Sequence, residues 1–494
     1  MVLARYFGAS GETDAFFLAF KIPNFMRRLF AEGSFSLAFV PVLSEVRATG
    51  DRQALKDLID HVAGTLAGIL LALTAVGVLA APLVLAIFAP GWLIDDRPEF
   101  GLSADMLRIT FPYILLISLT AFAGGILNTF DRFLVPALTP ALLNISLIAA
   151  AVLLSVRMEV PVKALAWGVL AAGIAQLLVQ VPALMRLGVM PRPRWGWRHP
   201  GMRKILRLMI PTLIGSSVAQ INLLLDVVIA TFLISGSVSW LYYSDRLLEF
   251  PLGVFGVALS TVILPNLSRK FARQDPHAFS ATLDWALRLA LIITLPAAVG
   301  LAILATPILI TLFQYEAFQL NDVEMASLSL SAYAAGLPAF IAVKVLAPGF
   351  YARQDTKTPV KIAIIAMVSN MAMNFIFVGV LLALAFKGPH TGLALASSAA
   401  AYMNAIMLFR GLRKQGAYHP EKGWGRVSFA VLAGCTAMAA ALWWQFGEIS
   451  LWVEAPALGR AMRLTGLISL GIVVYGMAIL AAGLRKHHLE KGAS

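Results

Sequence analysis

The sequence predicts an all-α protein that crosses a membrane many times. Of its 494 residues, 59% are hydrophobic and only 13% are charged, a balance far from that of soluble globular domains. Apolar runs of about 18 residues or more recur along the chain, and each could cross a hydrocarbon core of about 30 Å as a helix. These runs lack the period-two alternation of barrel strands, which favours helices.

We expect fourteen spans in order along the chain: 1–8, 14–45, 58–90, 105–128, 133–156, 162–187, 203–234, 238–267, 279–313, 325–351, 359–385, 392–412, 427–447 and 463–484. The first is too short to cross a bilayer, so we expect Met1 to fall inside a helix that begins upstream. No cleavable signal sequence is visible, because the pattern of a basic segment followed by an apolar one is missing.

Basic residues are distributed unevenly between alternating loops. Twenty-four Lys and Arg fall in loops on the side of residues 44–57, and the opposite loops hold five, namely Arg97, Arg157, Lys163, Lys387 and Arg460. This asymmetry predicts that the 44–57 side and the C-terminus are cytoplasmic. The net charge of +13 therefore reflects the orientation of the chain in the membrane, and it also attracts anionic lipid. Nucleic acid is not an expected partner. Cys435 is the only cysteine, which excludes disulfides within the chain and thiolate metal clusters.

Short sequence features recur 224 residues apart. Pro41-Val-Leu-Ser44 returns as Pro265-Asn-Leu-Ser268, and the spacing from Gly125 to Asp131 returns from Gly349 to Asp355. An offset of about six spans predicts two parallel six-helix lobes around a central cavity. The expected domains are an N-terminal lobe at 1–187, a cytoplasmic linker at 188–202, a C-terminal lobe at 203–412, two extra spans at 427–484 and a cytoplasmic tail at 485–494.

Charged residues interrupt two spans at matching positions of the two lobes. One is KIPNFMRRLFAEG, broken by Pro23 and Gly33, and the other is SDRLLEFPLG, broken by Pro251 and Gly253. A charge at mid-bilayer costs about 2.5–3.5 kcal/mol, so these side chains should face protein or water. The predicted cavity charges are Lys21, Arg27, Arg28, Arg246 and Lys344 against Asp14, Glu32, Asp226, Asp245 and Glu249. The alternative interpretation is a set of ion pairs that holds a closed gate between the lobes.

The segments DAFFLAFKIPNFMRRLFAEGSFSLAFVPVLSE, GSVSWLYYSDRLLEFPLGVFGVALSTVILP and KVLAPGFYARQDTKTPVKIA resemble the MurJ/MviN lipid II flippases of the multidrug/oligosaccharidyl-lipid/polysaccharide exporter superfamily. The resemblance covers nearly the whole chain. It implies fourteen spans in two lobes and movement of the undecaprenyl-pyrophosphate-linked peptidoglycan precursor to the outer leaflet by alternating access. It also implies that Asp14, Arg27 and Arg246 are charged cavity residues, and that further Ser and Arg residues belong to a first helix upstream of Met1.

The resemblance further implies that the last two spans form a groove for the polyprenyl tail. Trp443, Trp444 and Trp452 lie near the expected outer interface, where an ordinary aromatic belt accounts for them as well. The implied location is the bacterial cytoplasmic (inner) membrane, and the implied partners are lipid II and membrane lipids. We expect a monomer that can associate with the cell-wall synthesis machinery.

Residues for ATP-driven transport or for catalysis are not apparent. GLRKQG at residues 411–416 has the glycine spacing of a P-loop but lacks the Lys-Ser/Thr that follows it. We therefore expect a transporter that is not an enzyme, needs no cofactor and is driven by membrane potential or a cation gradient. A head group with two negative charges gains about 4.6 kcal/mol on moving outward against about 100 mV. Asp226, with Asn370 and Asn374 on one face of the span 359–385, forms a candidate sodium site like that described in some members of the family that the chain resembles. An Asn–Asp interhelical hydrogen bond explains the same residues.

Two other function classes stay open on the sequence. A polysaccharide or drug exporter of the same superfamily would have a cavity rich in aromatic and acidic residues, which the Arg27-Arg28 and Asp245-Arg246 pairs oppose. A membrane scaffold without transport would not require charged, broken helices inside the membrane.

Overall fold

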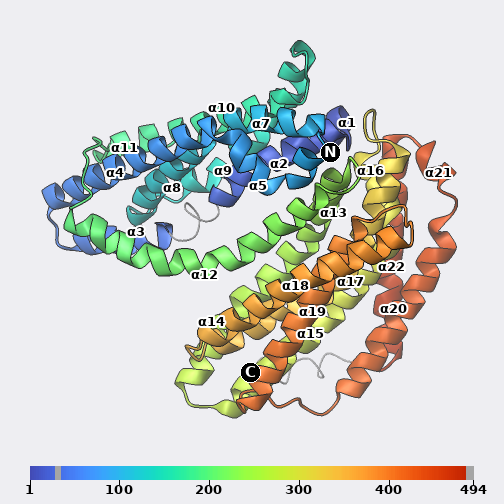
Figure 1. The fold of residues 1–494 in the computed structure, drawn as a ribbon. Coiled ribbons are helices and arrows are strands. Elements are labelled where there is room, and N and C mark those ends of the chain that lie inside the picture. Colours follow the sequence, from blue (N-terminus) through green and yellow to red (C-terminus); the bar gives the residue numbers. More distant parts are fainter. Residues whose placement is uncertain (28–34, 485–494) are drawn as a thin grey trace. The chain divides into compact units, whose positions relative to one another are not determined.

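The computed structural model describes residues 1–27 and 35–484, apart from the side chains of residue 37 and of residues 211–223. The described residues form helices joined by short loops (Figure 1). The helices up to the first long interhelix linker are α1 Val2–Phe7, α2 Gly11–Met26, α3 Ser36–Ala48, α4 Arg52–Leu79, α5 Ala81–Phe88, α6 Pro90–Ile94, α7 Pro98–Thr110, α8 Tyr113–Thr129, α9 Leu134–Ala149, the π-helix η2 Ala150–Leu154, the 3-10 helix η3 Ser155–Arg157, α10 Lys163–Leu178 and α11 Val181–Leu187.

After this linker the chain continues with a second series. It comprises α12 Pro200–Ala230, α13 Ser237–Pro251, the π-helix η4 Leu252–Val257, α14 Ala258–Ala272, α15 Pro276–Ile303, α16 Ala305–Phe313, α17 Leu320–Tyr351, α18 Lys357–Ala383, α19 Thr391–Lys414, α20 Trp424–Phe446, α21 Ser450–Val453 and α22 Ala457–Ala481. The predicted all-α, multi-pass fold class is confirmed.

Within the described residues, 11 helical segments are long and apolar enough to cross a membrane. They coincide with eleven of the expected spans. The other three expected spans, 1–8, 14–45 and 203–234, correspond to α1, to α2 with α3, and to α12. α1 has only six residues, and residues 28–34 between α2 and α3 lie outside the described part. The count of fourteen spans therefore stays a prediction.

The chain divides into two compact units, residues 2–239 and residues 240–494. The first unit includes α12, which packs against α3, α4 and α5. The sequence repeat placed the lobe boundary before this helix, in the linker at 188–202. The repeat-based domain boundaries stay a prediction.

The repeat is visible in the helix boundaries. α4 and α15 each have 28 residues and begin at Arg52 and Pro276, which are 224 residues apart. Each is capped by an aspartate one residue earlier, Asp51 or Asp275, whose carboxylate accepts backbone N–H bonds from the first turn. Both helices are followed, after a single residue, by another helix, α5 or α16. Two segments with different sequences therefore fold into the same local pattern.

The linker at 188–202 lies along α4 in the first unit. The Arg194 backbone N–H donates to the carbonyl oxygen of Asp60 at 2.9 Å. A Cβ atom on Gly64 would lie 2.2 Å from the Arg194 carbonyl oxygen, and one on Gly68 would lie 2.6 Å from the Trp195 ring. Glycine in α4 therefore permits the close approach of the linker.

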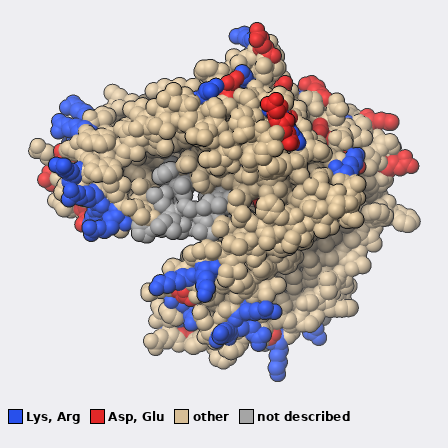
Figure 2. Space-filling model, in the orientation of Figure 1, with Lys and Arg blue, Asp and Glu red and all other residues tan. Residues whose placement is uncertain are grey.

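Basic side chains gather at one end of each unit (Figure 2). In the first unit they cover the end that carries α3, α11 and the start of α4, seen as blue atoms at the left. In the second unit they gather along its lower end in this view, around the labels α14 and α15 and the C mark. This clustering within each unit agrees with the charge asymmetry between loops.

Buried charged residues hold the last helices, α20 and α22, against other helices of the second unit. Arg460, at the start of α22, is 8% exposed and donates to four backbone carbonyls, two of which belong to Ile310 and Gln314 near the end of α16. Asp284 and Arg288 of α15 form a buried ion pair at 2.6 Å, which also binds the segment leading into α20.

The three tryptophans of the expected aromatic belt differ in exposure. Trp443 and Trp444 are 78% and 85% exposed, as a belt requires. Trp452 is only 2% exposed, and its indole N–H donates to the Phe446 carbonyl at 3.0 Å. Its place in the belt was therefore predicted wrongly, because the short helix α21 turns this side chain inward.

A buried histidine lies just before α19 in the second unit. The His390 ring is fully buried, lies 5.0 Å from the Trp240 ring, and donates from Nε2 to the Met325 carbonyl at 3.1 Å. Burial lowers the pKa of His390 from 6.5 to about 4, while the bond to Met325 opposes this shift. The ring is therefore neutral at physiological pH.

We expect this burial to make stability fall as the pH is lowered from 6.5 to about 4. The unfolded chain binds a proton there and the folded chain does not, at a cost of about 1.4 kcal/mol per pH unit. Thermal unfolding in detergent at several pH values measures this effect. His390→Gln, which keeps an N–H donor, should flatten the profile, whereas His277→Gln at an exposed position should not. Parallel profiles for wild type and His390→Gln would contradict the assignment.

Candidate functional site

The first interrupted span supplies Lys21 and Arg27 near the end of α2. Pro23 lies inside this helix, and Arg27, the last described residue before residues 28–34, is in a π turn. The Arg27 Nε–H donates to Asn24 Oδ1 at 3.0 Å, and both Lys21 and Arg27 are half-buried. Two other predicted site residues, Arg28 and Glu32, lie outside the described residues.

Asp14 lies seven residues before Lys21 on α2, and its carboxylate accepts three hydrogen bonds. Its carboxylate is 2% exposed and accepts from the backbone N–H groups of Gly236 and Ser239, each at 2.7 Å. It also accepts from the Ser239 hydroxyl at 2.5 Å. Asp14 therefore caps the first turn of α13, where a negative charge is favoured by the helix dipole. A direct contact of Asp14 with substrate stays a prediction.

Two more charged residues fix the chain between α12 and α13. The Arg97 guanidinium donates to the Leu233 carbonyl at 2.7 Å, and the Ser235 hydroxyl donates to Glu99 at 2.6 Å. Sequence reasoning counted Arg97 only as a loop charge. Together with Asp14, Arg97 and Glu99 hold the chain that leads into the second interrupted span.

The second interrupted span carries an ion pair on α13. Arg246 donates to Glu249 at 2.5 Å, and its guanidinium lies 5.0 Å from the centre of the Tyr242 ring. The two charged side chains are 40% and 41% exposed. Asp245 is adjacent on the helix and half-buried. The structure thus pairs two predicted site residues, and both side chains are partly exposed.

The break after Pro251 takes the form of the π-helix η4. Gly256 in η4 lies against α17, because a Cβ atom at this position would be 2.7 Å from Cδ of Lys344. The stem of Lys344 therefore packs on the π-helix. π-Helical turns often occur at functional sites, and the combination of Pro251, Gly253 and Gly256 explains why one forms here.

All three candidate sodium ligands are buried. Asn370 and Asn374 of α18 are both fully buried, and Asn374 Nδ2 donates to Asn370 Oδ1 at 3.2 Å. Asn370 Nδ2 in turn donates to the Ser397 hydroxyl at 3.5 Å. Asp226 of α12 is 8% exposed and belongs to the first unit. Asn370 and Asn374 therefore lie on one face of α18, while the sodium site stays a prediction.

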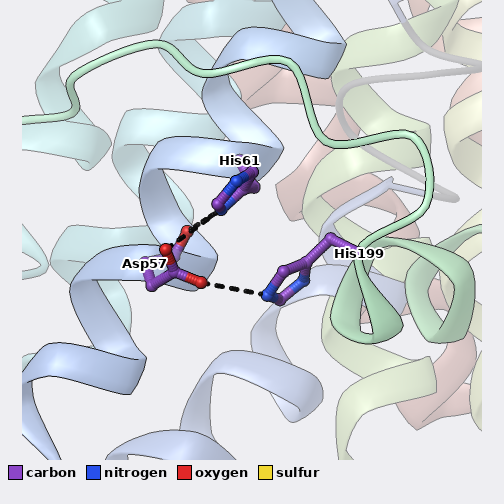
Figure 3. A group of neighbouring side chains, drawn as sticks. All are labelled: Asp57, His61 and His199. Atoms are coloured by element: carbon purple, nitrogen blue, oxygen red, sulfur yellow. Dashed lines mark hydrogen bonds and ion pairs between the residues drawn. The ribbon is translucent and has the colours of Figure 1, made fainter.

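A group that sequence reasoning missed joins α4 to the linker. Asp57 lies between His61 and His199, with one carboxylate oxygen directed at each ring (Figure 3). The sequence contained a partial signal, because Asp57 and His61 are four residues apart and share a helix face. Nothing in the sequence indicated that His199 comes to the same place.

The fold is that of a multi-pass membrane transporter. A solved structure described as the inward-facing conformation of a multidrug resistance MATE family transporter of the MOP superfamily aligns with a TM-score of 0.70 and 15% identity. It covers 84% of this chain and 93% of that one. At this identity the likeness shows the fold alone.

The more specific comparisons concern one family. The family model "Lipid II flippase MurJ" matches residues 3–458. A probable lipid II flippase MurJ of Haemophilus influenzae is 47% identical, with 99% of this chain and 97% of that protein covered. One of Vibrio cholerae is also 47% identical, with 99% and 93% covered. The solved structure "Lipid II flippase MurJ, inward closed conformation" aligns with a TM-score of 0.77 and 28% identity over 97% of this chain and 94% of that one. The chain belongs to the MurJ lipid II flippase family.

The capping role of Asp14 predicts a structural defect on substitution. We expect Asp14→Ala to destabilise the protein by about 3 kcal/mol, because each buried donor left unsatisfied costs about 1–3 kcal/mol. The measurement is the thermal unfolding midpoint in detergent. Glu12→Ala, an exposed position on the same helix turn, is the control and should unfold as wild type does. An unchanged midpoint for Asp14→Ala would show that the cap is unimportant.

Proposed function

We propose that this protein moves lipid II from the cytoplasmic to the outer leaflet of the bacterial cytoplasmic membrane by alternating access. The observation that carries the proposal is the match to lipid II flippases along nearly the whole chain. The expected orientation places the basic loops and the C-terminus in the cytoplasm.

The charged residues on the broken helices suit the head group of this substrate. Guanidinium groups bind diphosphates through two parallel hydrogen bonds and keep their charge when desolvated. Arg246 is 40% exposed in its pair with Glu249, and such half-exposed pairs contribute only about 0–1 kcal/mol to stability. A diphosphate can therefore replace Glu249 at low cost. Asp14, whose carboxylate accepts three hydrogen bonds, cannot be exchanged in the same way.

Transport of this kind needs no covalent chemistry, so we propose a transporter that is not an enzyme and needs no organic cofactor. Its proposed partners are lipid II and membrane lipids, and we propose a monomer that associates with cell-wall synthesis proteins. An exporter of polysaccharides or drugs is the second candidate. Only the fold supports it, because the likeness to a multidrug transporter is 15% in sequence.

Removing either guanidinium should impair flipping. Loss of a charge-assisted hydrogen bond costs about 1.5–3 kcal/mol, or about 10- to 100-fold in affinity. We expect Arg27→Ala and Arg246→Ala to lose complementation of a flippase-depleted bacterium, and Arg246→Lys to rescue only partly. Arg269→Ala is the matched control, since Arg269 also bonds a residue three positions away but lies on α14. Equal rescue of lysis by all variants at equal expression would defeat the site assignment.

Voltage or a sodium gradient could drive the transport cycle. We propose that Asp226, Asn370 and Asn374 hold the coupling sodium, because carboxylate and amide oxygens are suitable hard ligands. The prediction is that the flipping rate of wild type rises with the sodium gradient and that Asp226→Ala abolishes this dependence. The comparison uses purified protein in vesicles at fixed voltage. Asp226→Ala that stays fully sodium-dependent would remove these residues from the coupling site.

A further inference from the structure

Two histidines and an aspartate meet where the linker passes α4, close to its start at Arg52. His61 Nδ1 is 3.3 Å from Asp57 Oδ1, and His199 Nε2 is 3.2 Å from Asp57 Oδ2. The two imidazole rings are stacked at 4.9 Å with an angle of 13° between their planes. The potential ligand atoms of all three residues lie within 4.8 Å of one another. Figure 3 shows both rings facing the same carboxylate.

We propose that Asp57, His61 and His199 bind a divalent transition metal ion of the zinc class. Imidazole nitrogen and carboxylate oxygen are ligands that zinc prefers, and three protein ligands leave one position for water. Tetrahedral coordination at about 2.0–2.1 Å requires ligand atoms about 3.3 Å apart. The two histidine–aspartate distances match this spacing, each to a different oxygen of Asp57. His61 Nδ1 also donates to the Asp57 backbone carbonyl oxygen at 2.8 Å, so a metal on this nitrogen has to replace that bond. All three side chains are partly exposed, so small rotations can bring the remaining pair together.

Water has access to the proposed fourth position. The two histidines help to line a cavity of about 890 Å³, whose other lining residues are Trp195, Gly196, Trp197 and Arg198. Arg198, which is exposed, also lines this cavity. A position open to water favours a moderate affinity rather than that of a closed structural zinc site.

The hydrogen bonds of His199 add a second cost. Its Nδ1 accepts from the backbone N–H of Gly201 at 3.2 Å, so the proton of the neutral ring is on Nε2, where it can be donated to Asp57. A metal on Nε2 requires the ring proton to be on Nδ1, and the bond from Gly201 is then lost. The ring remains neutral overall, so the exchange needs no other reactant.

A neighbouring carboxylate does not compete for the ion. Asp60 is bound by Lys56 at 2.6 Å and accepts the backbone N–H of Arg192 at 2.7 Å. The negative charge available for a metal at this place is therefore that of Asp57. Because His199 is the N-cap residue of α12, a bound ion would fasten the start of α12 to α4.

Metal titration tests the proposal. Full-length protein without an affinity tag is purified, stripped with chelator and titrated with Zn²⁺ by calorimetry and with Co²⁺ by visible absorption. His487→Ala/His488→Ala serves as the baseline, since this adjacent pair could bind metal independently. We expect one ion per chain in the baseline protein. Addition of His61→Ala, His199→Ala or Asp57→Asn should weaken binding at least about tenfold, as loss of even an outer-shell partner does.

The matched control is His277→Ala, which removes an exposed histidine from the start of α15 and should leave binding unchanged. A second readout is trypsin cleavage after Arg194 and Arg198, which Zn²⁺ should slow in the baseline protein but not in His199→Ala. No binding to the baseline protein would overturn the proposal and leave an ion-pair cluster only. Binding that His61→Ala and His199→Ala do not weaken would overturn it as well. Neither result bears on lipid II transport.

Discussion

Every charge inside a bilayer has to be hydrogen-bonded or in contact with water, and this constraint explains much of the structure. Asp14, Arg460 and the Asp284–Arg288 pair are all buried, and backbone and side-chain groups together satisfy them. Each joins segments that are distant in sequence: α2 to the start of α13, α22 to α16, and α15 to the chain before α20. Their buried charges would be costly without these partners, which is why they specify one arrangement of the chain.

The interrupted helices follow from the same constraint applied to the backbone. A helix satisfies its own N–H and C=O groups, so a break inside the membrane is tolerated only where other groups or water replace the lost bonds. In α2 the break includes Pro23 and a π turn at Arg27, and in the second unit Pro251 leads into η4. Arg27 is in the π turn itself, and Arg246 lies on α13 about one and a half helical turns before η4. Local backbone geometry and local charge therefore point to the same part of each unit.

The long apolar runs, and the Pro and Gly residues that interrupt them, predicted the helices well. Such runs have few alternative structures in a membrane. α4 and α15 begin 224 residues apart, which is the same offset as that of the sequence repeat. Long-range partners could not be predicted. Nothing local in TDAFF indicates that Asp14 meets Ser239, and nothing in RWGWRHP indicates that the linker packs on Gly64. Such contacts depend on small residues that allow close approach, and glycine is common in transmembrane helices, so its presence alone indicates no particular contact.

The degree to which each charge is already bonded indicates which ones can bind a substrate. A carboxylate like that of Asp14 would have to give up three short hydrogen bonds before it could bind anything else. In the proposed site, Arg246 would exchange one pair that is about two-fifths exposed for equivalent bonds from a phosphate. A transporter must also release its substrate. When two partners bind a charged group with similar free energy, one can replace the other at low cost, which allows both binding and release. A buried charge whose hydrogen bonds are all made loses those bonds in any exchange, so it neither binds nor releases a ligand easily. The half-exposed arginine is therefore better suited to repeated transport cycles than the buried aspartate.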